Sequence, residues 1–474
     1  MEVADPKLSY IGQFCAKHSL SEPAFRLLLT VLLGYPLALI HRYFLFKKNP
    51  NYQHFYFAAC GLYLCCFNYG FKTCHSVINI GVVYGVLLVA GGTLFSAVFT
   101  FVFCMGYLLA GYFFTATGDY DITWTMPHCI LCLRLIGLAF DVYDGQKDPS
   151  SATASTKLPH DQKRTALDKV PTILEVMGHS YFFGAFLVGP QFPMKRYKDF
   201  VQGSFFKKDS KPSCIKPALL RLALGLLVLA FNLFGSKFYD DKYMLSDQFL
   251  QYNFLMRFLH MGVWQIITLH KYVSCWLLAE GSCIMAGLTY NGEDENGNDL
   301  WNGCVNIDVA LFETATTFGN LIKSFNINTN LWVAQYIFKR LKFLGNKDVS
   351  QLSALLFLAV WHGLHSGYYV CFFNEFIVMK FERDVIEIIE RLPRVKHIVY
   401  HKYLHIPRLI ILKVFVMGMF GYCIVPFVLL SFDRYSEAYS RVYWCGHIIY
   451  LSWIPLSPYV LKAIPRPATS KKAD

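Results

Sequence analysis

Charged side chains are scarce in this sequence. Asp, Glu, Lys and Arg make up 16% of its 474 residues, whereas they make up about 25% of an average soluble protein. Apolar residues make up 55% of the chain, and the mean hydropathy is +0.36. This shortage of charge excludes an ordinary soluble protein and indicates a polytopic membrane protein.

Marks of an exported, disulfide-bonded chain are also missing. The sequence has no Asn-x-Ser/Thr sequon, and its acidic, polar N-terminus does not resemble a cleaved signal peptide. The fifteen cysteines are scattered, many inside apolar runs, and the Cys129–Cys132 pair has no partner pair. We therefore expect buried thiols rather than zinc ligands or disulfides, with the first apolar segment acting as an uncleaved anchor.

The charges that are present are mostly basic and lie mostly in short loops. The formal net charge is +12, a sign that suits anionic headgroups or a phosphorylated substrate and also follows from the positive-inside rule. Nothing interleaves these basic residues as a nucleic-acid surface would. We therefore expect membrane lipid as a partner and no nucleic acid.

Apolar runs predict an all-α fold in one integral membrane domain, residues 1–474, with about ten or eleven crossings. Two amphipathic or mixed-charge stretches, 321–347 and 380–407, are expected to lie on the membrane surface. The polar stretches 141–172, 201–217 and 290–320 are expected outside the membrane. The predicted crossings are 24–46 with a kink at Pro36, 55–71, two helices or a helix and a re-entrant piece within 77–117 that are separated near Gly91–Gly92, 124–140, 173–200 with its helix ending at Gly189–Pro190, 218–238, 252–270, 272–289, 352–378, 409–431 and 443–463.

The most informative run is 352–378, LSALLFLAVWHGLHSGYYVCFFNEFIV, which carries His362 and His365 at its centre. An ionisable group at bilayer depth is costly and by default suggests function. Treated as one helix, the run places both rings on one face. A histidine here can be a satisfied structural residue, a metal ligand or a general base near neutral pH. Small neighbours leave room for a ligand beside the rings.

A metal site needs further ligands, and no second His-x-x-His or carboxylate-rich crossing is evident, so we expect no metal. His397, His401 and His405 recur every four residues, but in a charged segment that is expected to face headgroups. A general base needs a second polar group, and 325–330 (FNINTN) is unusually rich in amides. An asparagine there can orient an imidazole or donate to an oxyanion; a polar turn or helix cap is the alternative.

Three segments together, WHGLHSGYY, FNINTN and FLVGPQFPMKRY, resemble the membrane-bound O-acyltransferase family, and its lysophospholipid acyltransferase branch in particular. The likeness covers essentially the whole chain and is densest over 173–380. It implies a helical bundle that encloses a reaction tunnel. It also implies that the catalytic histidine is His362, in WHG, and that its partner is Asn326, the first asparagine of NINTN.

The resemblance further implies the reaction. An acyl group, expected to be polyunsaturated, passes from acyl-CoA to the free sn-2 hydroxyl of a lysophospholipid, chiefly lysophosphatidylcholine, with lysophosphatidylethanolamine and lysophosphatidylserine as further acceptors. Acyl-CoA is a substrate, and no cofactor is expected. No serine or cysteine nucleophile with its own base is evident, so direct transfer is favoured over an acyl-enzyme.

Further residues are candidates for substrate binding. Near the histidines and the asparagine these are Trp361, His365, Ser366 and Asn328. For the phosphates of coenzyme A they are Lys195, Arg196, Lys198, Lys339, Arg340 and Lys342. Each basic residue, taken singly, is equally suited to anchoring at the membrane surface.

The last four residues, Lys471–Asp474, look like a dilysine retrieval signal. With the resemblance, this predicts a multi-pass protein of the endoplasmic reticulum membrane with a cytosolic tail at 464–474, and a homodimer as one assembly. Two other functions remain open. An acyltransferase could use a protein or sterol acceptor, and a transporter could use a midplane histidine relay. A transporter is expected to carry charges in several crossings and often an inverted repeat, and neither is evident.

Overall fold

The computed structural model describes residues 9–119, 121–146, 158–206 and 212–464. Within these ranges the chain is helical, and its only β pairings are two isolated bridges, Glu293 with Asp299 and Ile307 with Phe325. The predicted all-α fold is confirmed.

Up to residue 250, the described part of the chain holds eleven α-helices. They are α1 (Tyr10–Lys17), α2 (Glu22–Ile40), α3 (Pro50–Tyr69), α4 (Cys74–Ala90), α5 (Leu94–Thr115), α6 (Thr125–Gly145), α7 (His160–Thr165), α8 (Ile173–Ser180), α9 (Met194–Gln202), α10 (Ile215–Gly235) and α11 (Asp247–Leu250), with short π or 3₁₀ turns η1 (His41–Leu45), η2 (Gly70–Thr73) and η3 (Tyr243–Leu245).

The second half begins with the longest helix and ends near the C-terminus. Its helices are α12 (Phe254–Ala286), α13 (Val309–Thr314), α14 (Phe318–Ser324), α15 (Ile327–Val333), η4 (Ala334–Phe338), η5 (Lys339–Leu344), α16 (Lys347–His362), α17 (Ser366–Arg391), α18 (Pro393–Val399), η6 (Lys402–Leu404), α19 (His405–Leu429), α20 (Phe432–Ser440) and α21 (Cys445–Ala463).

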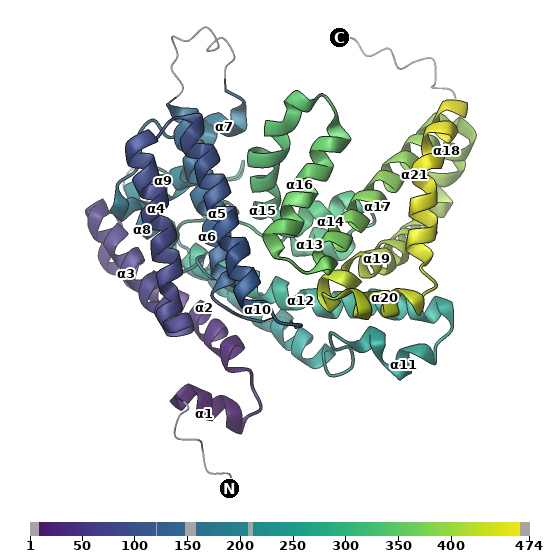
Figure 1. Ribbon diagram of the computed structural model, residues 1–474, viewed down its shortest axis with the longest axis horizontal. Coiled ribbons are helices and arrows are strands. Elements are labelled where there is room, and N and C mark those ends of the chain that lie inside the picture. Colours follow the sequence, from purple (N-terminus) through teal and green to yellow (C-terminus); the bar gives the residue numbers. More distant parts are fainter. Residues whose placement is uncertain (1–8, 120, 147–157, 207–211, 465–474) are drawn as a thin grey trace.

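These helices form two groups around a shared centre. Figure 1 shows α3–α9 on one side, α17–α21 on the other, and α15 and α16 between them. The long helix α12 joins the groups because it packs against α2, α10 and α19. The C-terminal end of α16, at Trp361, is buried between the two groups, whereas its N-terminal end, at Lys347, is exposed.

Six helical stretches of the described chain are long and apolar enough to cross a membrane. The other stretches expected to cross are shorter, interrupted or more polar, so length and composition alone do not reach the expected ten or eleven. The six are Glu22–Leu45, Pro50–Ala90, Leu94–Thr115, Thr125–Gly145, Ile215–Gly235 and Lys402–Leu429.

The predicted break within 77–117 is confirmed. Helix α4 ends at Ala90, Gly91 and Gly92 form the turn, and α5 begins after Thr93, whose hydroxyl accepts the backbone N–H of Ser96 at 3.2 Å. Glycine and a capping hydroxyl are the residues that end one helix and start the next.

The predicted break at 270–272 is wrong, because α12 continues without interruption from Phe254 to Ala286. The two ionisable residues at this point, His270 and Lys271, find partners beside the helix. Lys271 Nζ lies 3.0 Å from Asp241 Oδ2, and His270 Nε2 lies 3.1 Å from Glu313 Oε1. A polar pair in the middle of an apolar helix is tolerated when its partner lies on a neighbouring segment.

The helix predicted to run from 173 to Gly189–Pro190 is also wrong, since α8 ends at Ser180 and α9 begins at Met194. The side chain of Arg134, on the buried helix α6, organises the irregular segment between them. Its guanidinium donates to the carbonyls of His179, Ser180 and Ala185 at 2.8 to 3.1 Å, and its Nε donates to Gln191 Oε1 at 3.1 Å. In a helix these carbonyl groups would accept backbone N–H groups; here the buried guanidinium of Arg134 is their donor instead.

Replacing Arg134 with Met is expected to lower the free energy of unfolding by at least about 3 kcal/mol, because each buried carbonyl left without a donor costs about 1–3 kcal/mol. The apparent Tm in detergent measures this loss. The matched control is Arg383→Met, which removes a largely exposed pair with Asp348 at 3.1 Å and is expected to cost at most about 1 kcal/mol. Equal melting temperatures for the two variants would contradict this role of Arg134.

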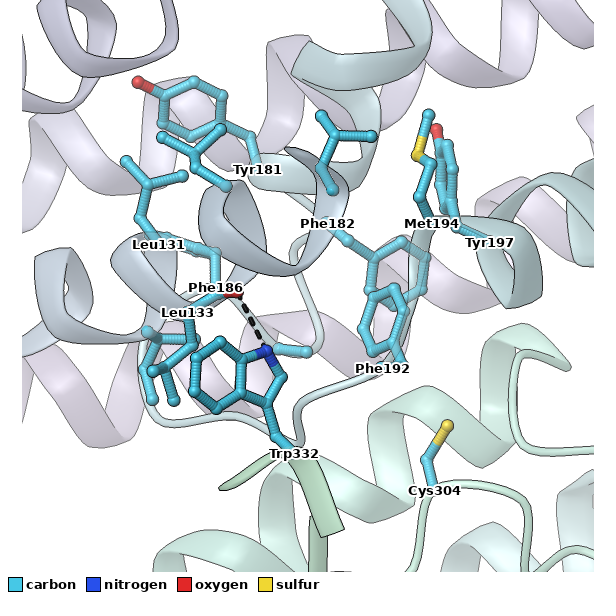
Figure 2. Packing of buried hydrophobic residues seen from close by; sticks show 14 of the residues in the cluster. Leu131, Leu133, Tyr181, Phe182, Phe186, Phe192, Met194, Tyr197, Cys304 and Trp332 are labelled. Atoms are coloured by element: carbon cyan, nitrogen blue, oxygen red, sulfur yellow. Dashed lines mark hydrogen bonds between the residues drawn. The ribbon is translucent and has the colours of Figure 1, made fainter. Parts of the chain in front are cut away.

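The prediction of a surface helix over 321–347 is wrong. Two aromatic residues of this stretch, Trp332 and Tyr336, are buried against α6, as Figure 2 shows for Trp332, whose indole N–H donates to Leu133 O at 3.0 Å. Tyr336 is also buried, and its hydroxyl donates to Asp141 Oδ1 at 2.7 Å. The amphipathic pattern therefore results from packing against α6, which offers hydrogen-bond acceptors to Trp332 and Tyr336, and not from contact with lipid headgroups.

The stretch 380–407 is not one surface helix either. Helix α17 runs on to Arg391, and the short α18 and η6 follow. Charges near the start of the stretch pair inside the protein: Asp384 accepts from Lys380 at 3.0 Å and from the indole N–H of Trp453, on α21, at 3.1 Å. The mixed charges thus stabilise α17 and its contact with α21.

Candidate active site

The two histidines do not share a helix face, contrary to the prediction for 352–378. Helix α16 ends at His362, Gly363 takes φ 139° and ψ −167°, and α17 begins at Ser366 with His365 as its N-cap residue. A side chain rarely adopts that backbone conformation, so glycine makes the break possible. His362 is therefore held at a helix end, where its backbone and ring have fewer helical neighbours.

The second small residue of the motif serves packing. A Cβ added to Gly367 would lie 1.9 Å from the carbonyl oxygen of Pro426, and the Gly367 N–H donates to Leu430 O at 3.0 Å. Gly363 lines the cavity described next, and Gly367 does not. Of the two glycines expected to make room for a ligand, one instead lets α19 approach α17.

A cavity of about 1140 Å³ lies between the two groups of helices. Its walls come from α2, α5, α6, α10, α12, α14, α15, η4, α16, α17 and α19 and from the loops beside them, and most of its lining side chains are apolar. Four of the predicted site residues line it: His362, Asn326, Trp361 and His365. A largely apolar cavity with a few polar groups is the usual form of a site for an apolar ligand.

One hydrogen bond fixes the ring of His362. Its Nδ1 lies 2.7 Å from Leu358 O, one turn back on α16. A carbonyl oxygen can only accept, so Nδ1 carries a proton and the neutral ring keeps its lone pair on Nε2. Aromatic rings surround the imidazole, with centroids of Trp361, Phe372 and Phe427 at 4.6 to 5.2 Å. The ring is thereby oriented, and Nε2 is its remaining basic atom.

Asn326 precedes α15 in the left-handed conformation, with φ 48° and ψ 45°, and its side chain makes no capping bond. Asparagine tolerates this conformation better than most residues. Its Oδ1 accepts the amide of Asn306 at 3.4 Å. The amide NH₂ group of Asn326 is thus left without a partner among the described residues, on a side chain that lines the cavity.

Asn306 is a site residue that the sequence analysis missed. It is buried, and besides supporting Asn326 its Oδ1 accepts the backbone N–H of Asn328 at 3.1 Å, while its carbonyl accepts from the N–H of Ile327 at 3.0 Å. The only sign of it in the sequence was its place in the Gly- and Asn-rich stretch 290–320. Its pairing with a segment twenty residues away is a tertiary contact that spacing does not reveal.

Two other predicted residues lie outside the cavity lining. Ser366 is exposed, and its hydroxyl accepts from the hydroxyl of Tyr435 at 3.1 Å. Asn328 donates to the carbonyls of Cys304 and Val305 at 3.1 and 2.9 Å. The first contact joins α17 to α20, and the second joins α15 to the segment before α13. Trp361, by contrast, stays in the lining and also donates to Cys129 O at 2.9 Å.

The predicted coenzyme A ligands also lie outside the cavity lining, and most bind within the protein. Arg196 donates to Leu288 O and Tyr290 O. Arg340 forms two hydrogen bonds with the carboxylate of Asp144, at 2.6 and 3.1 Å. The three lysines among them with acidic partners are Lys195 with Asp199, Lys198 with Glu175 and Lys339 with Asp161. Lys342 is exposed.

Two further predictions concern the end of the chain. The dilysine tail, Lys471–Asp474, lies outside the described residues. His397, His401 and His405 lie in or beside α18 and η6, exposed or half-buried. Among the described residues, no group of three or more His, Cys, Asp and Glu side chains could hold a metal ion.

Comparison of the chain with known proteins identifies its family. The model of the membrane-bound O-acyltransferase family matches residues 109–425, a range that includes Asn326, His362 and Glu375. The chain is 45% identical to lysophospholipid acyltransferase 5 of Homo sapiens, over 96% of this chain and 92% of that protein. It is 44% identical to the protein of that name in Drosophila melanogaster, over 91% and 86%, and 34% identical to that in Caenorhabditis elegans, over 97% and 96%. The chain belongs to the membrane-bound O-acyltransferase family.

Proposed function

We propose that this protein transfers a fatty acyl group from acyl-CoA to the free sn-2 hydroxyl of a lysophospholipid, chiefly lysophosphatidylcholine, and so re-forms phosphatidylcholine. The observation that carries the proposal is the fixed imidazole of His362 in a large, mostly apolar cavity. The names of the relatives, lysophospholipid acyltransferases, favour this acceptor class over a protein or a sterol.

His362 acts as the general base. With Nδ1 bound to Leu358 O, Nε2 takes the proton of the acceptor hydroxyl as its oxygen attacks the thioester carbonyl carbon. The new C–O bond forms, the carbonyl oxygen carries the negative charge, and the C–S bond then breaks. The departing thiolate takes the proton back from the imidazolium, so that the enzyme is unchanged and no acyl-enzyme forms.

Asn326 supplies the second polar group. Its Oδ1 is held by Asn306, so its NH₂ group is available to a substrate oxygen. A fixed amide donor of this kind stabilises an oxyanion more than a carbonyl, which lowers the barrier and not just the binding energy. Asn306 accepts the backbone N–H of Ile327 with its carbonyl oxygen and that of Asn328 with its Oδ1, and these two bonds hold the donor in place.

The cavity suits two substrates with long acyl chains. Its volume of about 1140 Å³ exceeds the roughly 300–1,000 Å³ of an ordinary ligand pocket. Its lining includes residues 115–117 and the start of α2, and also Phe338 of η4 and Met379 of α17. We propose that the donor is polyunsaturated acyl-CoA and that the enzyme works in the endoplasmic reticulum membrane, with its dilysine tail in the cytosol.

The proposed reaction has a direct test. Purified protein in mixed micelles is incubated with arachidonoyl-CoA and palmitoyl-CoA, and with the lysophospholipid forms of phosphatidylcholine, phosphatidylethanolamine and phosphatidylserine. We expect diacyl phospholipid and free thiol in equal amounts, with the fastest turnover for arachidonoyl-CoA and lysophosphatidylcholine, as measured by mass spectrometry and a thiol reagent. Cholesterol and an acceptor peptide are the controls; acylation of either in preference to every lysophospholipid would refute the proposal.

A further inference from the structure

The cavity contains a carboxylate that the proposed reaction does not use. Glu375 lies on α17 and is half-buried in the cavity wall. It forms no hydrogen bond or ion pair with any described residue. A carboxylate inside a membrane protein is costly, faces an interior cavity as a rule, and is kept for a partner.

The other charged groups in the cavity lining have partners. Lys271 pairs with Asp241 at 3.0 Å, and Asp119 pairs with Arg434 at 2.7 Å. Asp121 accepts from the hydroxyl of Thr117. Lys271 is the only lysine or arginine in the described lining. Glu375 is therefore the one lining carboxylate without a partner, and the lining provides no free cation to neutralise it.

The groups around Glu375 suit a bulky organic cation. The cavity face of α17 is formed by Tyr368, Cys371, Phe372, Glu375 and Met379, and the facing part of α19 adds Phe420 and Phe427. Phe372 and Phe427 are 6.4 Å apart, with their ring planes at 81°. A carboxylate with aromatic rings beside it is the combination that recognises quaternary ammonium groups.

We propose that Glu375 binds the positively charged headgroup nitrogen of the acceptor lysophospholipid and so selects choline, ethanolamine or serine headgroups over those without an ammonium group. This inference rests on the proposed function, and it adds the residue that determines headgroup specificity.

The position of Glu375 relative to His362 fits one bound acceptor. The His362 ring lies 5.2 Å from the ring of Phe372, and Glu375 follows Phe372 by three residues, which is about 4.5 Å of helix rise. Residues three apart share a helix face. In a lysophospholipid, the sn-2 hydroxyl and the headgroup nitrogen are separated by one carbon, the phosphodiester and an ethylene bridge. One molecule can thus place its hydroxyl at His362 and its nitrogen about one helical turn further along the wall.

Acceptor kinetics test the proposal. For wild type, Glu375→Gln and Glu375→Asp, kcat/KM is measured with 1-palmitoyl-lysophosphatidylcholine and 1-palmitoyl-lysophosphatidylglycerol, whose headgroup has no ammonium. Glu375→Gln is expected to lower kcat/KM for the choline lipid by about tenfold or more, because it removes the charge-paired contact to the quaternary ammonium group. The value for the glycerol lipid is expected to stay equal or rise. Glu375→Asp is expected to keep part of the preference.

Two further measurements keep the test decisive. Glu387→Gln makes the same change on the same helix, at a carboxylate paired with Arg391 outside the cavity lining, and is expected to leave both values unchanged. Binding of both lysolipids to His362→Gln, with and without Glu375→Gln, gives the preference without turnover. Equal losses for both lipids, or no loss for either, would overturn the role of Glu375. Absence of phospholipid product from wild type would instead refute the proposed function, while the binding comparison still tests Glu375.

Discussion

Replacing His362 with Ala is expected to lower acyl transfer by about a hundredfold to ten-thousandfold, which is the range that a general base contributes. The substitution removes the ring whose Nε2 is available in the cavity. It removes only one hydrogen bond, the 2.7 Å contact with Leu358 O at the end of α16, so the free energy of unfolding is expected to fall by about 1 kcal/mol. Initial rates with arachidonoyl-CoA and lysophosphatidylcholine measure the first quantity, and thermal unfolding measures the second.

His365 provides the matched control. It lies three residues away, lines the cavity and caps α17, but its ring makes no hydrogen bond with a described residue. His365→Ala is expected to leave most of the turnover, and His362→Gln, which keeps an amide near Leu358 O, is expected to be as inactive as His362→Ala. A well-folded His362→Ala protein with normal turnover, alongside an inactive His365→Ala protein, would show that the base has been assigned to the wrong ring.

The elements that could be predicted from the sequence are those fixed by local composition. The lengths of the apolar runs predict most of the helices. Gly91–Gly92 and Thr93 correctly predict a break, because the glycines end α4 and the threonine caps α5. The same logic failed at His270–Lys271. There two separate runs, 252–270 and 272–289, are predicted, but Asp241 and Glu313 lie beside the helix as partners of Lys271 and His270, and α12 continues.

Predictions that failed depended on contacts between distant segments. No residue near 181–193 indicates that the side chain of Arg134 binds the carbonyl groups of this segment. The continuous apolar run therefore predicts a single helix. The amphipathic pattern around Trp332 and Tyr336 has the same period whether its partner is a headgroup layer or α6. Only the structure distinguishes the two partners, through the bonds to Leu133 O and Asp141.

The site shows the same division. His362 and Asn326 were identified from motifs, and both line the cavity. The sequence does not point to Asn306, because it supports Asn326 across twenty residues that include the helices α13 and α14. The basic residues were chosen by charge alone, and the structure places Arg196 and Arg340 in bonds with backbone carbonyls and with Asp144. A charge in a sequence does not show whether its partner is a substrate or the protein itself.

Replacing Asn326 with Ala is expected to reduce turnover by roughly a hundredfold or more, as the loss of one oxyanion donor does. The substitution has a second effect, because Asn326 has φ 48° and ψ 45°. Alanine in that left-handed conformation costs roughly 1–2 kcal/mol. A fall in activity on this variant alone could therefore come from the lost amide or from a shifted α15.

Asn326→Gly separates these two causes. Glycine adopts the left-handed conformation without strain, so this variant keeps the path of the chain into α15 and removes only the amide. If the amide donates to the reacting oxygen, the glycine and alanine variants are equally slow, although the glycine variant is the more stable of the two in thermal unfolding. Asn328→Ala, which frees the carbonyls of Cys304 and Val305 outside the cavity lining, is expected to lose stability and to keep more turnover per folded molecule. Recovery of normal turnover in Asn326→Gly would mean that Asn326 shapes the backbone before α15 and that the donor to the oxyanion is another group in the cavity.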